Sequence, residues 1–148
     1  MRHRCVALLL ALVLCATSAT TPAQTAADSA RTRFDGDWLV TMSCPNNSEK
    51  SAARGYKRQF PARVEGGVLH GETGVADAPG WLRLDGRIGA DGSALIDANG
   101  RTGDPDYAVS HPPAASSYAF HVEARFDDAR GTGKRLEQRV CSFVFERK

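Results

Sequence analysis

Two His-x-Glu pairs are the first candidates for a chemical site in this sequence. His70 with Glu72, and His121 with Glu123, each place an imidazole and a carboxylate on one face of an extended chain, because strand side chains repeat every two residues. Two such pairs on neighbouring strands could bind a metal ion through nitrogen and oxygen ligands. The apolar residues next to both histidines, however, are expected on the inward face of the same strands, so the histidines face outward. We therefore expect both pairs to be solvated surface, with no metal bound.

Oxygen ligands for calcium are the second possibility. The candidates are Asp97, Asn99, Asp104 and Asp106. Their spacing is not that of an EF-hand, and no glutamate closes the set. Turn formation at Asn99-Gly100 and Asp104-Pro105 accounts for these residues without a metal. We expect no metal and no cofactor here.

A nucleophilic site is not displayed by the sequence. There is no Gly-x-Ser-x-Gly motif, and no free cysteine is expected in the folded domain. His111 is the one histidine in a loop expected to border a cavity, but its neighbour Ser110 points away from it on an extended chain. We expect a protein that is not an enzyme. A hydrolase whose site is assembled from distant residues stays an alternative.

A binding site is the remaining possibility, and it centres on the longest irregular stretch, residues 100–117, which contains three prolines. Tyr107 and His111 lie in this stretch, and Tyr118 follows it, so we predict these three as ligand-binding residues. Loops on a rigid scaffold often carry function, although the stretch could equally be a connection that packs over one end of the fold. The predicted role is binding of a small apolar ligand or a protein partner. An alternative is a periplasmic inhibitor of a protease or lysozyme.

The elements that must position these residues are short strands. Polar and apolar residues alternate in seven segments, separated by glycine-rich turns: residues 38–44, 56–64, 68–73, 81–88, 93–99, 118–126 and 134–145. No segment after residue 23 has a helical period. The pattern predicts an all-β fold, either a single antiparallel meander barrel or a β-sandwich. A closed meander needs an even number of strands, and residues 107–109 are a candidate for the eighth.

Two cysteines are predicted to join the first strand to the last. Cys44 and Cys141 are the cysteines left after residue 23, and two cysteines in an exported chain most simply form a disulfide. If the two strands are antiparallel neighbours with these cysteines opposed, Trp38 lies opposite Arg147.

One tripeptide resembles a family motif. Gly36-Asp37-Trp38 is similar to the Gly-x-Trp that opens the first strand of calycin barrels, the avidin and lipocalin families. In those families a basic residue of the last strand packs over the tryptophan. The resemblance implies a calycin-like barrel in which Gly36, Trp38 and Arg147 have this structural role.

The beginning of the chain predicts export. A basic start and a short apolar run, residues 5–15, are typical of a signal peptide, which we assign to residues 1–23. Residues 24–33 are interpreted as a flexible leader and residues 34–148 as a single all-β domain. Cys15 follows Leu14, which is too large for a lipidation signal, so we expect a periplasmic or secreted product.

The amino-acid composition limits the classes of partner that the protein is expected to bind. The 148 residues include 19 basic and 17 acidic ones, and removal of residues 1–23 takes away Arg2 and Arg4, which leaves 17 of each. A net charge near zero gives little support to nucleic-acid binding. No membrane span is expected in the processed chain, and we expect a monomer that binds an unknown small molecule or protein.

Overall fold

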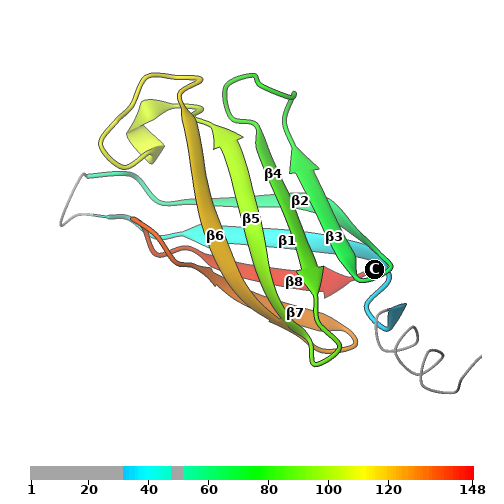
Figure 1. Cartoon of the computed structure of the whole chain (residues 1–148). Coiled ribbons are helices and arrows are strands. Elements are labelled where there is room, and N and C mark those ends of the chain that lie inside the picture. Colours follow the sequence, from blue (N-terminus) through cyan, green and yellow to red (C-terminus); the bar gives the residue numbers. More distant parts are fainter. Residues whose placement is uncertain (1–31, 48–51) are drawn as a thin grey trace, which may run out of the picture.

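Eight antiparallel strands follow one another around a closed barrel in the computed structural model, which describes residues 32–47 and 52–148 (Figure 1). Each strand pairs with its neighbour in the chain, and the last pairs with the first. The strands are β1 (Gly36–Cys44), β2 (Tyr56–Glu65), β3 (Val68–Thr73), β4 (Leu82–Ile88), β5 (Ser93–Arg101), β6 (Ser117–Phe126), β7 (Arg130–Arg135) and β8 (Ser142–Arg147). The all-β prediction is confirmed, as a barrel and not a sandwich. The predicted signal peptide, residues 1–23, lies outside the described residues.

The strand count differs from the prediction because residues 134–145 are not one strand. β7 begins at Arg130, within a segment expected to be a turn, and a loop separates it from β8. The inward positions of β7 include Gly131 and Gly133, which carry no side chain and so show no alternation in the sequence. Tyr107, expected in an eighth strand, instead ends η1 (Pro105–Tyr107), a 3-10 turn capped by the side chain of Asp104.

The register between β1 and β8 is the predicted one. Trp38 lies opposite Arg147, and Val40 lies opposite Phe145. Cys44 and Cys141 form a disulfide, with their Cα atoms 4.3 Å apart. The covalent link and the hydrogen-bonded pairing therefore support the same closure of the barrel.

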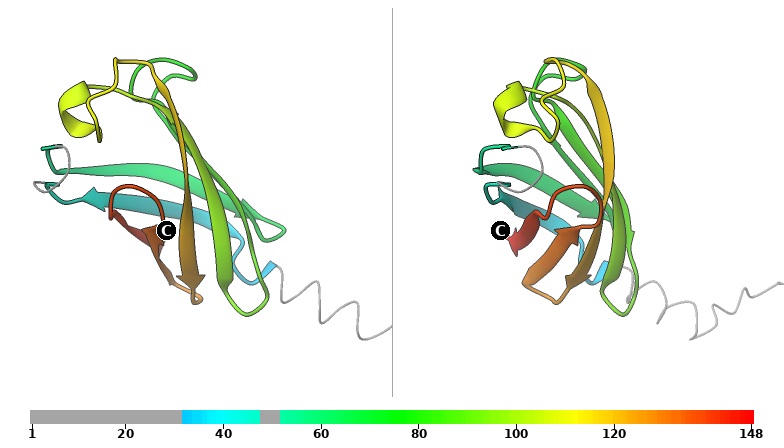
Figure 2. Two further views of the ribbon diagram at one scale, coloured as in Figure 1. Left: turned by 60° about the vertical axis from the view of Figure 1, so that its left-hand side comes forward. Right: turned by 90° about the vertical axis from the view of Figure 1, so that its left-hand side faces the viewer.

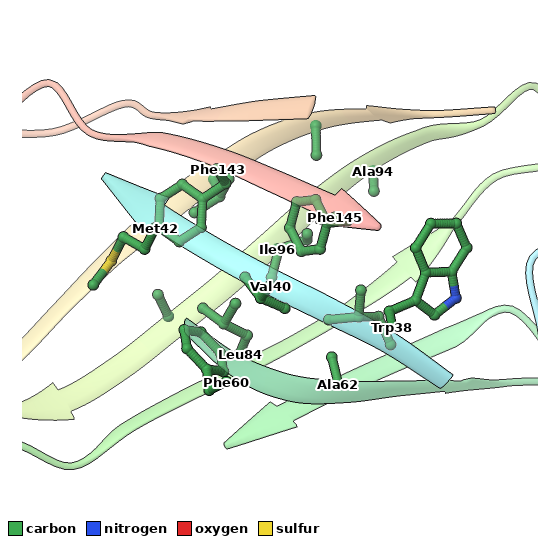
Figure 3. Close-up of a cluster of buried hydrophobic side chains, with 14 of the residues drawn as sticks. Trp38, Val40, Met42, Phe60, Ala62, Leu84, Ala94, Ile96, Phe143 and Phe145 are labelled. Atoms are coloured by element: carbon green, nitrogen blue, oxygen red, sulfur yellow. The ribbon is translucent and has the colours of Figure 1, made fainter. Parts of the chain in front are cut away.

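Buried hydrophobic side chains from the strands form a core inside the barrel (Figure 3). Trp38 and Phe126 are buried and meet edge to face, with ring centroids 5.5 Å apart, and Phe34 packs against Phe126 at 6.2 Å. The indole nitrogen of Trp38 donates to the carbonyl of Phe34 at 3.0 Å. Burial of each such aromatic side chain contributes about 2–3 kcal/mol, so this cluster is a main source of stability.

The two ends of the barrel differ because a meander alternates its connections. The turns β2–β3, β4–β5 and β6–β7 lie at the end where the chain enters and leaves the barrel, which we call the closed end. The longer β1–β2, β3–β4, β5–β6 and β7–β8 loops lie at the opposite end, called the open end (Figure 2). The stretch with η1 therefore belongs to the open end.

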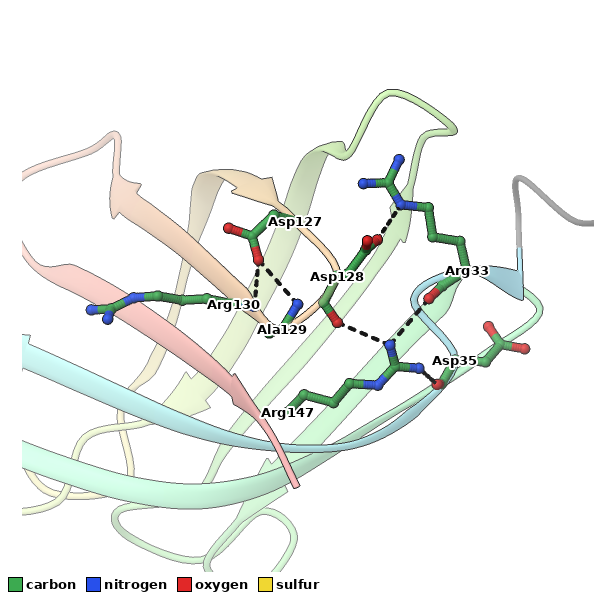
Figure 4. A network of polar contacts seen from close by, with 7 residues as sticks. All are labelled: Arg33, Asp35, Asp127, Asp128, Ala129, Arg130 and Arg147. Atoms are coloured by element: carbon green, nitrogen blue, oxygen red, sulfur yellow. Dashed lines mark hydrogen bonds and ion pairs between the residues drawn. The ribbon is translucent and has the colours of Figure 1, made fainter.

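The side chain of Arg147 connects the chain that enters the barrel to the β6–β7 turn at the closed end. Its guanidinium donates to the carbonyls of Asp128, at 2.9 Å, of Arg33, at 3.2 Å, and of Asp35 (Figure 4). Gly36 has a φ of 138°, which favours glycine, and a Cβ there would lie 3.5 Å from the guanidinium. The Gly36 backbone therefore lies in contact with the side chain of Arg147.

Candidate ligand-binding site

A cavity of about 370 Å³ occupies the open end of the barrel. Its wall is formed by inward side chains of the strands and by the β5–β6 and β7–β8 loops. The lining residues are Met42, Tyr56, Lys57, Arg58, Gly80, Arg101, Thr102, Gly103, Asp104, Tyr107, Ala108, Val109, Pro112, Tyr118, Phe120, Arg135, Gln138 and Arg139. The volume falls in the range of small-molecule sites, about 300–1,000 Å³.

The strand alternation explains why polar groups reach this cavity. On β2, Tyr56 and Arg58 share the inward phase of the buried Phe60, and on β6 Tyr118 shares the phase of Phe120. Arg135 is the last residue of β7 and pairs with Val122, whose side chain is buried inside the barrel. The inward positions that are apolar in mid-barrel thus become aromatic or basic at the open end.

Aromatic rings make up much of the wall. Tyr118 stacks on Phe120, with an interplanar angle of 8° and centroids 6.0 Å apart, and Tyr56 meets Tyr107 edge to face at 6.0 Å. Gly100 gives the Tyr118 ring its room, because a Cβ at position 100 would lie 2.4 Å from the phenol oxygen. Flat apolar surfaces therefore face the cavity from two sides.

Arg139 holds the mouth of the cavity together. This side chain is buried, and it donates to the carbonyls of Tyr107 at 2.7 Å, Arg54 at 2.6 Å and Pro45 at 2.5 Å. Its partners belong to the β1–β2 and β5–β6 loops, while Arg139 belongs to the β7–β8 loop. The disulfide at Cys141, two residues on, anchors the same loop. One guanidinium therefore ties three loops together.

Arg58 and Arg135 reach the cavity without a carboxylate partner among the described residues. Arg58 donates to the carbonyl of Gly80 at 2.6 Å. The Arg135 guanidinium carbon lies 4.1 Å above the centroid of Phe120. Its one hydrogen bond to a described residue is a long one, 3.3 Å to the side chain of Gln138, and its Nε is buried without a partner.

Burial changes the pKa of two groups that line the cavity, Arg135 and Tyr118. Burial holds the pKa of Arg135 below its ordinary value, although the nearby phenols of Tyr56 and Tyr118 partly counter this effect. Burial also raises the pKa of Tyr118 to about 12. At neutral pH the phenol is therefore a neutral hydrogen-bond donor, and the guanidinium keeps its charge.

The structure brings two of the three predicted ligand-binding residues to the cavity. Tyr107 and Tyr118 line it, whereas His111 lies exposed in the same loop and is not a lining residue. The sequence analysis missed Arg58, Arg135 and Arg139. The signal that could have revealed Arg58 is its inward phase on β2, since a basic residue at a core position is unusual.

Both His-x-Glu pairs lie on the outer face, as predicted. His70 and His121 are exposed. Nδ1 of His70 pairs with Asp85 of the neighbouring strand β4 at 2.8 Å, and Nδ1 of His121 pairs with Glu137 of the β7–β8 loop at 2.5 Å. Among the residues that the structure describes, no group of three or more His, Cys, Asp or Glu side chains could hold a metal ion.

The acidic residues considered for calcium have other partners. Asp104 accepts from the backbone of Asp106 at 3.0 Å, and Asp106 lies 3.5 Å from Arg54. Asp97 and Asn99 are exposed on β5, and the turn expected at Asn99-Gly100 is wrong because both residues lie within this strand. Asp104 thus has the turn role that its sequence setting predicted.

Comparisons with protein-family models, curated proteins and solved structures find no significant match to this chain. A helix long and apolar enough to cross a membrane is also not found within residues 32–47 and 52–148.

Proposed function

We propose that the barrel is a binding protein that holds one small molecule in the cavity at its open end. The observation that carries the proposal is the cavity itself, about 370 Å³ with tyrosine and phenylalanine rings on its wall and a few polar groups directed into it. This combination is typical of ligand sites in the mouths of β-barrels. The ligand has a body that is largely apolar, because the aromatic rings offer flat surfaces and few hydrogen bonds.

We also propose that the protein is exported from the cytoplasm. A disulfide that joins the end of β1 to the β7–β8 loop is compatible with an oxidising compartment, where such bonds form and persist. The predicted signal peptide supplies the route. Intact-mass measurement of the protein recovered outside the cytoplasm would show a chain shortened by about the first 23 residues, and an unshortened chain would contradict export by this route.

The other two functions considered from the sequence receive less support. A hydrolase needs a nucleophile or an acid–base pair, but the residues lining the cavity include no His, Cys or Ser, and their one carboxylate, Asp104, caps η1. An inhibitor of a protease or lysozyme would be favoured by a filled interior and a protruding loop. A hollow open end instead favours a small ligand over a protein partner.

The test uses a neutral fluorescent probe, N-phenyl-1-naphthylamine, which brightens in apolar surroundings. We expect saturable binding of one probe per protein. Ala108→Phe inserts a ring into the cavity and should abolish binding, whereas Ala119→Phe makes the same change on the exposed face of β6 and should not. Absence of binding by the folded wild-type protein, or equal binding by both variants, would contradict the proposal.

A further inference from the structure

The charged residues around the cavity are mostly basic. Five lining residues are basic and one is acidic: Lys57, Arg58, Arg101, Arg135 and Arg139 against Asp104. The carboxylate of Asp104 is occupied in capping η1. A concave, partly desolvated site with a surplus of positive charge attracts anions, because field lines are concentrated in a cleft with low-dielectric walls.

The basic residues differ in how far their donors are already used. Arg139 is bound to three carbonyls, and Arg101 pairs with Asp77 at 2.8 Å. Arg58 has one bond to a carbonyl. Lys57 is exposed on the outward phase of β2. Of the four arginines, Arg135 has the weakest set of contacts, a 3.3 Å hydrogen bond and an aromatic ring. Its guanidinium is the cation most available to a ligand.

Leaving Arg135 in this position costs free energy. A guanidinium removed from water without an ionic partner loses hydration that one weak hydrogen bond does not replace. Cation–π contact with Phe120 offsets part of the cost, since such contacts contribute about 0.5–2 kcal/mol. An apolar residue at the end of β7 would avoid the cost entirely. An anionic ligand bound to the Arg135 guanidinium would supply the missing ionic partner and offset this cost.

Two tyrosine hydroxyl groups lie near the Arg135 guanidinium. Tyr56 and Tyr118 both lie near enough to Arg135 to affect its titration, and both line the cavity. No hydrogen bond between either hydroxyl and a described residue is found. A hydroxyl pair next to a guanidinium can donate to the same anionic oxygen atoms that the guanidinium binds.

We propose that the cavity selects an amphipathic organic anion, whose charged head is bound by Arg135 with help from the Tyr56 and Tyr118 hydroxyls and whose apolar body packs on the aromatic wall. The inference rests on the proposed function and adds the class of ligand to it. Arg139 is a positioning residue, because its donors are taken up by loop carbonyls. A planar carboxylate is the simplest head that accepts two parallel bonds from a guanidinium.

The experiment compares two molecules of nearly the same shape by calorimetry, 2-naphthoate and its neutral amide, 2-naphthamide. The wild-type protein should bind the acid at least about tenfold more tightly than the amide, the factor expected for charge-assisted hydrogen bonds. Arg135→Met should remove this preference with little change for the amide. Arg125→Met, on the exposed outer face of β6, is the matched control and should keep it.

A second measurement uses the wild-type protein alone, so it does not depend on whether the variants fold. The buried Nε–H of Arg135 should shift in the ¹⁵N spectrum when naphthoate is added and shift less with naphthamide. Equal affinity for acid and amide, or an unchanged preference in Arg135→Met, would overturn the anion inference and leave the binding function intact. Failure of naphthoate, naphthamide and the neutral fluorescent probe alike would overturn both.

Discussion

The guanidinium carbon of Arg147 lies 5.7 Å from the ring centroid of Trp38, across the seam where the first and last strands close the barrel. A cation at this distance from an indole is attracted to the face of the ring. Arg147 is the last residue of β8, and the ends of strands tend to fray. Three carbonyl acceptors nevertheless hold its guanidinium in place, so its contribution should exceed that of the ring contact alone.

The first prediction concerns this pair. Arg147→Ala should lower the free energy of unfolding by about 1–2 kcal/mol, since it removes hydrogen bonds to carbonyls as well as the ring contact. Arg147→Lys should cost less, because it keeps the charge but loses the planar fork. In a double-mutant cycle with Trp38→Leu, measured by urea unfolding, a coupling of about 0.5–1 kcal/mol is expected. Strictly additive losses would show that the two side chains do not interact.

The second prediction concerns the disulfide. Cys44 and Cys141 are separated by 97 positions, and a bond that closes so long a loop stabilises by about 4–5 kcal/mol in the chain-entropy description. The double replacement Cys44→Ala with Cys141→Ala should therefore shift the urea midpoint strongly downward. Thiol labelling of the unreduced processed protein should find no reactive cysteine. Two labelled cysteines per chain would rule out the bond.

The third prediction concerns the stability of the empty barrel. Arg135→Met should leave the free energy of unfolding of the ligand-free protein unchanged or raise it by up to about 1 kcal/mol, because it removes a poorly compensated buried charge. Removal of a merely structural arginine would lower stability instead. Thermal unfolding checks the sign, with Arg125→Met as the exposed control.

The fourth prediction concerns the room left for Tyr118. In Gly100→Ala the new Cβ would lie 2.4 Å from the phenol oxygen and 2.6 Å from the carbonyl oxygen of Trp81. Tyr118 must then move into the cavity, so ligand affinity should fall and stability should drop by about 1–3 kcal/mol. Gly103→Ala is the control for the stability effect alone, because Gly103 itself lines the cavity and a Cβ there would have its nearest neighbour 3.3 Å away. Equal effects of both changes would contradict the packing described.

The fifth prediction concerns pH. The hydrogen bond to Glu137 raises the pKa of His121 above its ordinary 6.5, and the same bond lowers the pKa of Glu137 below its ordinary 4.5. The contribution of His121 is therefore complete below about pH 6.5 and is lost as pH rises through the raised value. That of Glu137 is present above pH 4.5 and is lost as pH falls through the lowered value.

The pair should thus stabilise the barrel most between about pH 4.5 and 6.5. In an NMR titration, Glu137→Gln should bring the pKa of His121 down toward its ordinary value. The difference in unfolding midpoint between the wild type and His121→Gln should shrink above neutral pH. A His121 titration unaffected by Glu137→Gln would show that the pair does not form in solution.

Local pattern was enough to predict which residues face inward on most strands. The period of two along β1, β2 and β6 depends only on successive residues, so their core faces could be read directly. One cross-link was then enough for the β1–β8 register, because opposing Cys44 to Cys141 determines every other pair, Trp38 and Arg147 included. The prediction that Arg147 lies opposite Trp38 followed from that pairing.

The tertiary structure alone decided the eighth strand and the composition of the cavity. β7 carries glycine at two of its inward positions, Gly131 and Gly133, and pairs with β6 and β8, so only its neighbours reveal it as a strand. Arg135 on β7, Tyr118 on β6 and Tyr56 on β2 are far apart in the chain and meet when the barrel closes. Which basic residues stay free to bind a ligand depends on loop carbonyls brought in from other segments, a long-range property that no local pattern encodes.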